Sequence, residues 1–215
     1  MHEHHISTPR TARYLTLGDP GPAIREVWFV LHGYGQLAAR FLRAFAPLDD
    51  GSRLIVAPEG LSRFYVDPAH RERVGSSWMT REDRLHEIAD YVRYLDAVAA
   101  EVLEWVHPRT VRVHVLGFSQ GTATACRWSA LGTAHVHRLV LWGGEVPPDL
   151  DLGAARGRLA PLEPVLVAGS RDELITPKIR ARDEERLRAA AIPFRVVSFD
   201  GGHELNDAVL RQLAG

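Results

Sequence analysis

The sequence predicts an α/β fold of three layers, in which a mostly parallel central sheet carries helices on both faces. Short, continuously apolar runs alternate along the chain with amphipathic segments. Such runs are typical of strands covered on both faces, which is the usual state of strands in a parallel sheet. The repeated order of strand and helix implies right-handed crossovers. At 215 residues the chain suits one domain, so we expect a disordered tail over 1–10 and a single domain over 11–215.

The first half of the chain predicts three strands, at residues 13–17, 27–31 and 54–57, the first of them at an edge of the sheet. An amphipathic helix is expected between the second and third strands. Its buried face would contain Phe41, Leu42, Phe45 and Leu48. Residues 61–81 show no clear period, and we expect an irregular loop there. Loops of this length in compact domains usually contribute to function.

The clearest helix of the sequence follows this loop. Thr80 and Asp83 predict a capping box at its start, and Pro108 is expected to end it. Its apolar residues recur at steps of three and four along one face: Leu85, Ile88, Val92, Leu95, Ala99, Val102 and Val106.

The second half of the chain predicts four further strands, at residues 111–116, 138–142, 165–168 and 194–199. Gly143 to Pro164 is rich in proline and glycine and predicts a loop with one short helix. Thr176 followed by Pro177 predicts a helix start, and that helix should run to about residue 191. A short helix closes the chain.

One motif carries the chemistry. Gly117-Phe118-Ser119-Gln120-Gly121 reads G-x-S-x-G and lies between a predicted strand and a predicted helix. This context is that of a nucleophile elbow, in which a sharp turn forces the serine into a strained backbone conformation. The glycines leave room for the strand to meet the helix, and the hydroxyl stays exposed near the free N–H groups of the helix N-terminus. An ordinary glycine-rich turn with a capping serine is the alternative.

A serine hydroxyl is a weak nucleophile that needs a base, and the base needs a carboxylate to orient it. Because ligands bind beyond the carboxyl ends of parallel strands, we searched those ends for both groups. The order Ser119, Asp172, His203 matches the order that this kind of elbow uses. Glu173 is the alternative acid. His32 is the alternative base, although it directly follows a buried strand and is expected to anchor the neighbouring loop.

An attacked carbonyl becomes an oxyanion that needs donors aimed at it beforehand. The backbone N–H of Gln120, directly after the nucleophile, is one expected donor. The second is expected from the loop after the strand at 27–31, where Gly33 and Gly35 permit a close backbone approach, and we assign it to the N–H of Tyr34.

Composition argues against several other classes. A net charge of −1 gives no reason to expect nucleic acid as a partner. Cys126 is the only cysteine, so no disulfide within the chain is expected. No apolar run approaches the length of a membrane span and the first residues lack a signal-peptide pattern, so we expect a cytoplasmic protein. We see no metal-ligand spacing, dinucleotide fingerprint or phosphate loop, and we expect neither a metal nor a cofactor.

Four segments together resemble the phospholipase/carboxylesterase family of α/β-hydrolases, which includes small carboxylesterases and acyl-protein thioesterases. They are residues 31–35, 117–121, 169–172 and 201–203. The resemblance covers the chain from about residue 13, and it implies the α/β-hydrolase fold without a large cap domain, no cofactor, and cleavage of esters or thioesters. It places the catalytic roles on Ser119, Asp172 and His203, and the oxyanion donors on Tyr34 and Gln120.

The family also implies where substrate would lie. Ser77-Trp78 resembles a pair that lines the acyl pocket in family members. Substrate contacts are expected from Gly33, Tyr34, Trp78, Met79 and Leu174. The alternative is that Trp78 and Met79 simply belong to the core.

Three functions follow in order of preference. The first is a serine carboxylesterase that acts on small-molecule esters through an acyl-enzyme intermediate. The second is a long-chain acyl thioesterase or lysophospholipase, and the third is a non-catalytic small-molecule binder on a hydrolase fold. After His32-Gly33, many thioesterase members carry Leu-Gly-Asp where this chain has Tyr34-Gly35-Gln36, which favours the first. A homodimer remains open.

Overall fold

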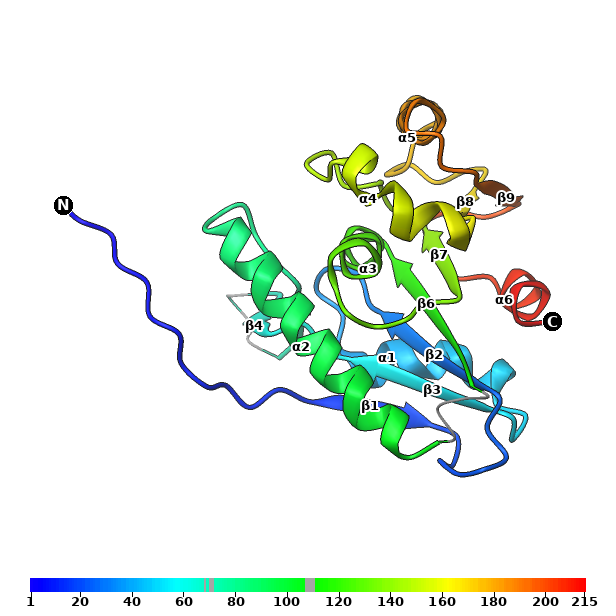
Figure 1. The fold of residues 1–215 in the computed structure, drawn as a ribbon, viewed down its shortest axis with the longest axis horizontal. Coiled ribbons are helices and arrows are strands. Elements are labelled where there is room, and N and C mark those ends of the chain that lie inside the picture. The colour runs from blue at the N-terminus through cyan, green and yellow to red at the C-terminus, as the bar shows by residue number, and fades with distance from the viewer. Residues whose placement is uncertain (68, 70–71, 107–110) are drawn as a thin grey trace.

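The computed structural model describes residues 1–67, 69, 72–106 and 111–215, and a seven-stranded sheet forms its central layer (Figure 1). The strand order is β1-β3-β2-β6-β7-β8-β9. All neighbours pair in parallel except β1 and β3 at one edge. The mostly parallel sheet and the edge position of its first strand are therefore as predicted. The strands are β1 (Tyr14–Leu17), β2 (Glu26–Leu31), β3 (Arg53–Pro58), β6 (Arg112–Phe118), β7 (Arg138–Trp142), β8 (Val165–Gly169) and β9 (Arg195–Phe199).

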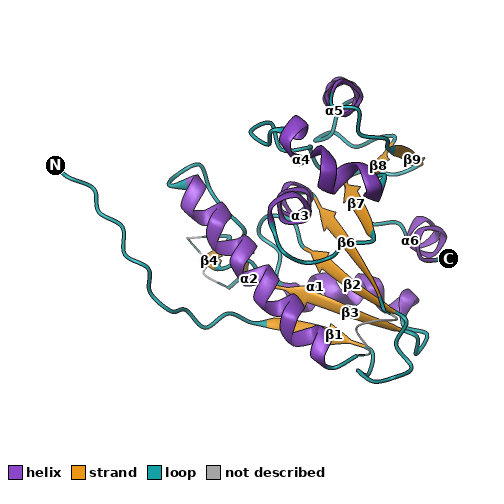
Figure 2. Ribbon diagram, in the orientation of Figure 1, coloured by secondary structure: helices purple, strands orange, loops and turns teal. Residues whose placement is uncertain are grey.

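Helices cover both faces of the sheet, which makes the three layers that the sequence predicts (Figure 2). One face is covered by α2 (Arg84–Glu104), α3 (Gln120–Leu131), α4 (Leu152–Leu159) and α5 (Pro177–Ala189). The other is covered by α1 (Ala38–Leu42), the 3-10 helix η1 (Arg43–Leu48) and α6 (Asp207–Ala214). A second 3-10 helix, η2 (Ala160–Leu162), follows α4. Among the residues described, no helix is both long enough and apolar enough to cross a bilayer.

The strand β2 shows why these runs are apolar throughout. Val27, Phe29 and Leu31 pack into the core on the α2 and α3 face, whereas Trp28 and Val30 pack into the core on the α1 and α6 face. Because successive side chains of a strand point to opposite faces, a strand buried on both sides has no polar alternation.

The expectation of an irregular loop over residues 61–81 is wrong. This segment contains a hairpin of β4 (Ser62–Tyr65) and β5 (Val74–Ser77), whose strands pair antiparallel. The strand β5 also bridges to the segment after β2: the Gly35 N–H donates to Ser76 O (2.9 Å) and the Ser76 N–H donates to Gln36 O (3.1 Å). The strand β5 is thus formed by its pairing with β4, and an isolated bridge joins it to a segment about forty residues away.

The predicted capping box at the start of α2 is also wrong. Asp83 is the N-cap residue, but it has a positive φ of 48° and its side chain makes no capping hydrogen bond. Its carboxylate accepts from His86 Nδ1 instead (2.6 Å), while the Thr80 N–H donates to Glu87 (2.5 Å). Leu85, expected on the buried face, is 72% exposed.

The rest of the helix α2 follows its predicted period from Ile88 to Val102. Pro108, expected to end the helix, lies outside the described residues. The predicted helix over Phe41–Leu48 is α-helical only to Leu42 and continues as η1, which contains Pro47. Residues 1–10 carry no helix or strand.

His114 on β6 gives the fold a pH dependence. Its ring stacks on Trp28 (4.6 Å between centroids), and neither ring nitrogen has a hydrogen-bond partner. Burial lowers the pKa of His114 to about 4, against the opposing effect of Glu26 and with a further lowering by Arg138. An unfolded chain takes up this proton near pH 6.5, and the folded chain only near pH 4.

We therefore predict that the free energy of unfolding falls as pH drops from 6.5 to 4, and that His114 contributes about 3 kcal/mol of this fall. His114→Phe keeps the ring stacking and removes the titration, so its stability should depend less on pH over this range. Urea unfolding of both proteins at several pH values measures the difference. Equal slopes for the two proteins would contradict the assignment.

Candidate active site

Ser119 lies at the sharp turn between β6 and α3, as the motif predicts. Its φ of 54° and ψ of −119° are a conformation that residues other than glycine rarely adopt. Hydrogen bonds on both sides hold the turn: the Ser119 N–H donates to Trp142 O (2.9 Å), and the Thr122 N–H donates to Ser119 O (3.0 Å). The strained serine is thus fixed to the neighbouring strand β7 and to the first turn of α3.

The two glycines of the motif are required by backbone contacts. A Cβ atom on Gly117 would lie 2.1 Å from Gly121 O, and a Cβ atom on Gly121 would lie 2.1 Å from Leu31 O. Both obstacles are backbone atoms, which cannot move aside as the end of a long side chain can. The ends of β6, α3 and β2 therefore meet at distances that only glycine allows.

Asp172 and His203 are brought together from the ends of two neighbouring strands, β8 and β9. His203 Nδ1 donates to Asp172 Oδ2 (2.9 Å), while Asp172 Oδ1 accepts from the N–H groups of Leu174 and Ile175 (both 2.9 Å). Burial by itself would raise the pKa of Asp172, but the hydrogen bonds from Ile175, His203 and Leu174 lower it overall. Asp172 is thus held as a carboxylate against the imidazole, whereas Glu173 is exposed.

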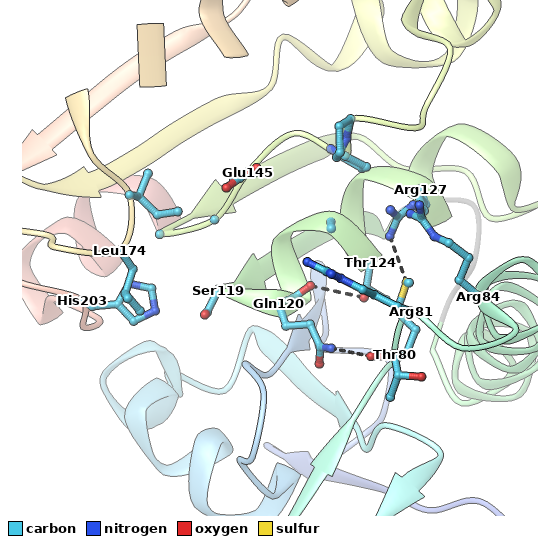
Figure 3. A pocket seen from close by; sticks show the side chains of 17 residues that line it. Thr80, Arg81, Arg84, Ser119, Gln120, Thr124, Arg127, Glu145, Leu174 and His203 are labelled. Atoms are coloured by element: carbon cyan, nitrogen blue, oxygen red, sulfur yellow. Dashed lines mark hydrogen bonds between the residues drawn. The ribbon is translucent and has the colours of Figure 1, made fainter. Parts of the chain in front are cut away.

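The imidazole of His203 and the hydroxyl of Ser119 line the same pocket (Figure 3). Because Nδ1 of His203 donates to Asp172, the neutral ring carries its lone pair on Nε2, which is the tautomer a general base needs. Within the described part of the chain, no hydrogen bond joins the Ser119 hydroxyl to the ring. Such contacts are often long in ligand-free enzymes and shorten when substrate binds.

The proposed oxyanion donors lie beside Ser119. Gln120 is the first residue of α3, so its N–H is one of those that a helix leaves unused. A Cβ atom on Gly33 would lie 3.0 Å from Cβ of Ser119, which places the loop after β2 against the nucleophile. In the residues described, the N–H of Tyr34 donates no hydrogen bond, and its side chain is 61% exposed. The ring of Tyr34 lies against that of Phe64 (5.0 Å between centroids), and Tyr34 is not among the residues that line the pocket.

His32 is a structural residue, as its place after a buried strand predicts. Its Nδ1 bonds Gly33 O (2.8 Å) and its Nε2 accepts from the Gly60 N–H (2.9 Å). Burial lowers the pKa of His32, which favours the neutral ring that these two bonds require. His32 therefore fixes the loop that carries Gly33 and Tyr34.

The side chain of Gln120 has a role that sequence reasoning missed. Its amide donates to Ser77 Oγ (3.0 Å) and to Met79 O (2.9 Å), and it accepts from the Trp78 N–H (3.1 Å). These bonds tie the start of α3 to the segment after the hairpin. No signal in the sequence links residue 120 to residues 77–79, because they lie about forty positions apart.

The pocket at Ser119 has a volume of about 510 Å³, within the range of small-molecule sites. One side comes from a single face of α3 and another from the segment that precedes α2. Its polar and charged lining residues are Thr80, Arg81, Arg84, Ser119, Gln120, Thr124, Arg127, Glu145 and His203. The arginines were not among the predicted site residues, although the spacing 120, 123, 124, 127 marks one face of a helix.

Of the predicted substrate contacts, Met79 and Leu174 line this pocket. Trp78 does not: it is 2% exposed and belongs to the core, and its indole N–H donates to His32 O (2.8 Å). Gly33 and Tyr34 lie outside the lining, although Gly33 contacts Ser119. Trp78 therefore belongs to the core, whereas Met79 packs against the core and lines the pocket as well.

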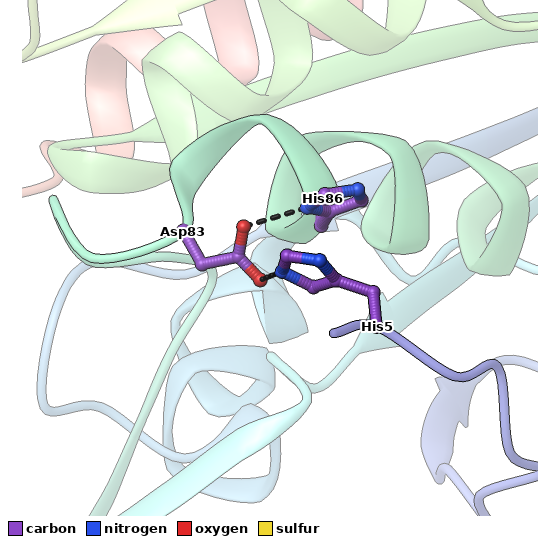
Figure 4. A group of neighbouring side chains, drawn as sticks. All are labelled: His5, Asp83 and His86. Atoms are coloured by element: carbon purple, nitrogen blue, oxygen red, sulfur yellow. Dashed lines mark hydrogen bonds and ion pairs between the residues drawn. The ribbon is translucent and has the colours of Figure 1, made fainter. Parts of the chain in front are cut away.

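One further cluster of polar groups lies away from this pocket. The ligand atoms of His5, Asp83 and His86 lie within 4.8 Å of one another, and all three residues are exposed (Figure 4). Asp83 already pairs with both rings, at 3.2 Å to His5 and 2.6 Å to His86. These pairs fasten the N-terminal segment to the start of α2.

Several solved structures share the fold of this chain. No family model and no curated protein matches the sequence. Among solved structures, Zea mays acyl-protein thioesterase 2 matches with a TM-score of 0.71 at 17% identity, over 94% of this chain and 98% of that one. The esterase PE8 matches with a TM-score of 0.68 at 18% identity, over 95% and 97% of the two chains.

A carboxylesterase of Bacillus cereus also matches, with a TM-score of 0.68 at 15% identity, over 94% of this chain and 92% of that one. The chain therefore has the α/β-hydrolase fold over nearly its whole length, and the predicted resemblance is confirmed at the level of fold. At 15–18% identity the structural likeness shows the fold alone.

The glycine contacts at the elbow predict a large loss of stability for Gly121→Ala, about 3 kcal/mol or more, because the new methyl group would overlap Leu31 O. Gly157→Ala is the matched control: Gly157 is exposed on α4 with no atom within 4 Å of the new methyl group. It should gain roughly 0.5 to 1 kcal/mol. Urea unfolding of both variants measures this, and a Gly121→Ala protein as stable as the unmodified chain would contradict the close packing.

Proposed function

We propose that this protein is a serine hydrolase that cleaves carboxylic esters of small molecules through an acyl-enzyme intermediate. The observation that carries the proposal is the pairing of His203 Nδ1 with the buried carboxylate of Asp172, in the pocket that also contains the strained Ser119. The fold shared with esterases and an acyl-protein thioesterase supports it.

In the proposed reaction, Ser119 Oγ attacks the ester carbonyl while His203 Nε2 takes the hydroxyl proton. Asp172 stabilises the imidazolium that forms. The N–H groups of Gln120 and Tyr34 donate to the oxyanion of the tetrahedral intermediate. His203 then returns the proton to the departing alcohol as its C–O bond breaks. Water, activated by the same ring, hydrolyses the acyl-enzyme and restores Ser119.

A long-chain thioesterase or lysophospholipase is the second candidate. The likeness to an acyl-protein thioesterase favours it, as does the contribution of Met79, Pro147 and Pro148 to the pocket lining. Against a long acyl chain stands the charged lining at Arg81, Arg84 and Arg127. Methylene groups placed there would bury charged side chains without replacing their water, which is unfavourable.

Ser119→Ala should lower kcat for a p-nitrophenyl ester by about 10⁶-fold and Asp172→Asn by about 10⁴-fold, by analogy with serine proteases. The matched control for the acid is Glu173→Gln, which alters the adjacent exposed carboxylate and should keep activity within about twofold. Steady-state kinetics of the purified variants, each first shown to be folded by circular dichroism, measure these losses. Full activity in Ser119→Ala, or a larger loss in Glu173→Gln than in Asp172→Asn, would refute the assignment.

A series of p-nitrophenyl esters from acetate to palmitate separates the two candidate functions. We expect kcat/KM to be highest for acyl chains of about two to six carbons, since a pocket of this size suits a small ligand. A steady rise of kcat/KM toward palmitate would instead support the long-chain function.

A further inference from the structure

Three arginines line the pocket at Ser119, and their charges are only partly matched. They are Arg81 on the segment before α2, Arg84 at the first position of α2, and Arg127 on α3. We infer that the substrate is an ester that carries an anionic group, a carboxylate or a phosphate, which these arginines bind in the same pocket as Ser119. The inference rests on the proposed hydrolysis at Ser119 and specifies its substrate class.

Arg127 is the most deeply buried of the three. It is 4% exposed, and its guanidinium bonds Asp149 Oδ1 (2.5 Å), Tyr91 Oη (3.3 Å) and Met79 Sδ (3.5 Å). Its Nε has no hydrogen-bond partner. This Nε is itself buried, so it leaves the charge of Arg127 incompletely compensated but is not a contact for a ligand in the pocket.

A single oxygen of Asp149 pairs with two arginines. The same Oδ1 that accepts from Arg127 also lies 3.0 Å from Arg84, and the buried Nε of Arg84 lacks a partner as well. One carboxylate thus faces two guanidinium groups, which leaves an excess positive charge and two unpaired donors beside the pocket. Guanidinium forks match the oxygen geometry of carboxylates and phosphates.

Arg81 adds a third charge without a partner. Across the residues described, its guanidinium makes no hydrogen bond or ion pair, and its side chain reaches from the segment before α2 toward the Ser119 end of the pocket (Figure 3). An unpaired surface arginine is common, but this one lines a pocket that already holds an excess of positive charge.

The geometry of α3 sets the distance in the pocket between the nucleophile at its start and Arg127. Arg127 lies two helical turns after Gln120, about 10 Å along the helix axis. Gln120, Ala123, Thr124 and Arg127 all line the pocket from this one face. An ester bound at Ser119 would therefore place a group several bonds away against the arginines.

Glu145, the acidic residue of the pocket lining, does not neutralise the excess positive charge of the arginines. Glu145 bonds Arg182 (2.8 Å), which lies outside the lining, and it therefore already has a cation. Figure 3 shows Glu145 away from Arg84 and Arg127. An anion bound by the arginines of the pocket would thus gain their attraction without direct contact with Glu145.

Paired substrates test the inference. We compare p-nitrophenyl hemiesters of succinate, glutarate and adipate with neutral p-nitrophenyl esters of the same chain lengths. For at least one chain length, the unmodified protein should prefer the hemiester by about tenfold or more in kcat/KM, which is the effect of one hydrogen bond to a charged group. In Arg81→Gln and in Arg81→Gln/Arg84→Gln this preference should fall by about tenfold.

The matched control is Arg93→Gln, which removes an equal charge from an exposed site on α2 outside this pocket and should keep the preference. A preference for the neutral ester at every chain length, or a preference that survives in Arg81→Gln/Arg84→Gln, would overturn the inference.

Direct binding separates this inference from the proposed activity. Titration calorimetry on the Ser119→Ala protein uses monomethyl adipate as the carboxylate probe and pentyl phosphate as the phosphate probe. Binding of either probe that weakens about tenfold in Ser119→Ala/Arg81→Gln supports the anion site even if no ester is hydrolysed, and the tighter of the two identifies the group. Absence of binding by both probes, or equal binding to both proteins, would overturn it.

Discussion

The close approach of three backbone segments at Gly117 and Gly121 is the constraint on which the candidate site depends. The strand β6 can turn directly into α3 only because neither residue carries a side chain, and the turn forces Ser119 to a positive φ. That conformation raises the hydroxyl above the sheet and leaves the N–H of Gln120 at the start of the helix. The loop after β2 meets the same point through Gly33. Three features of the candidate site thus meet at one close contact of the backbone.

Local signals in the sequence were sufficient to predict the sheet and the elbow. The apolar runs of β2 and β6 and the Thr176-Pro177 helix start each encode their structure within a few residues, and Thr176 Oγ1 does accept from the Ile179 N–H. The predictions for Trp78 and for the β4–β5 hairpin were wrong. The burial of Trp78 and the bridge from Ser76 to Gln36 depend on contacts with residues some forty positions away, which no local period reports. Chain order and positions after predicted strands together paired Asp172 with His203, and the two strands, β8 and β9, are neighbours.

The pocket combines a fold shared by esterases with a lining that the fold does not dictate. The elbow and the Asp172–His203 pair depend on strand ends, which the sheet fixes. Arg127 lies on α3, Arg84 at the start of α2 and Arg81 just before it, where side chains can change without disturbing the strands. In the proposed function, the groups that break the ester bond and the groups that select the substrate therefore lie in different parts of this chain.

The most direct test of the account is whether Ser119 is an activated nucleophile. The folded protein is treated with a fluorophosphonate, which reacts with serines activated by a histidine, and its peptides are analysed by mass spectrometry. The account predicts one adduct, on the peptide that contains Ser119, and its loss in His203→Ala. An unlabelled protein that is stabilised by small-molecule ligands, or an adduct on another residue with Ser119 unmodified, would contradict it and favour a binding protein on a hydrolase fold.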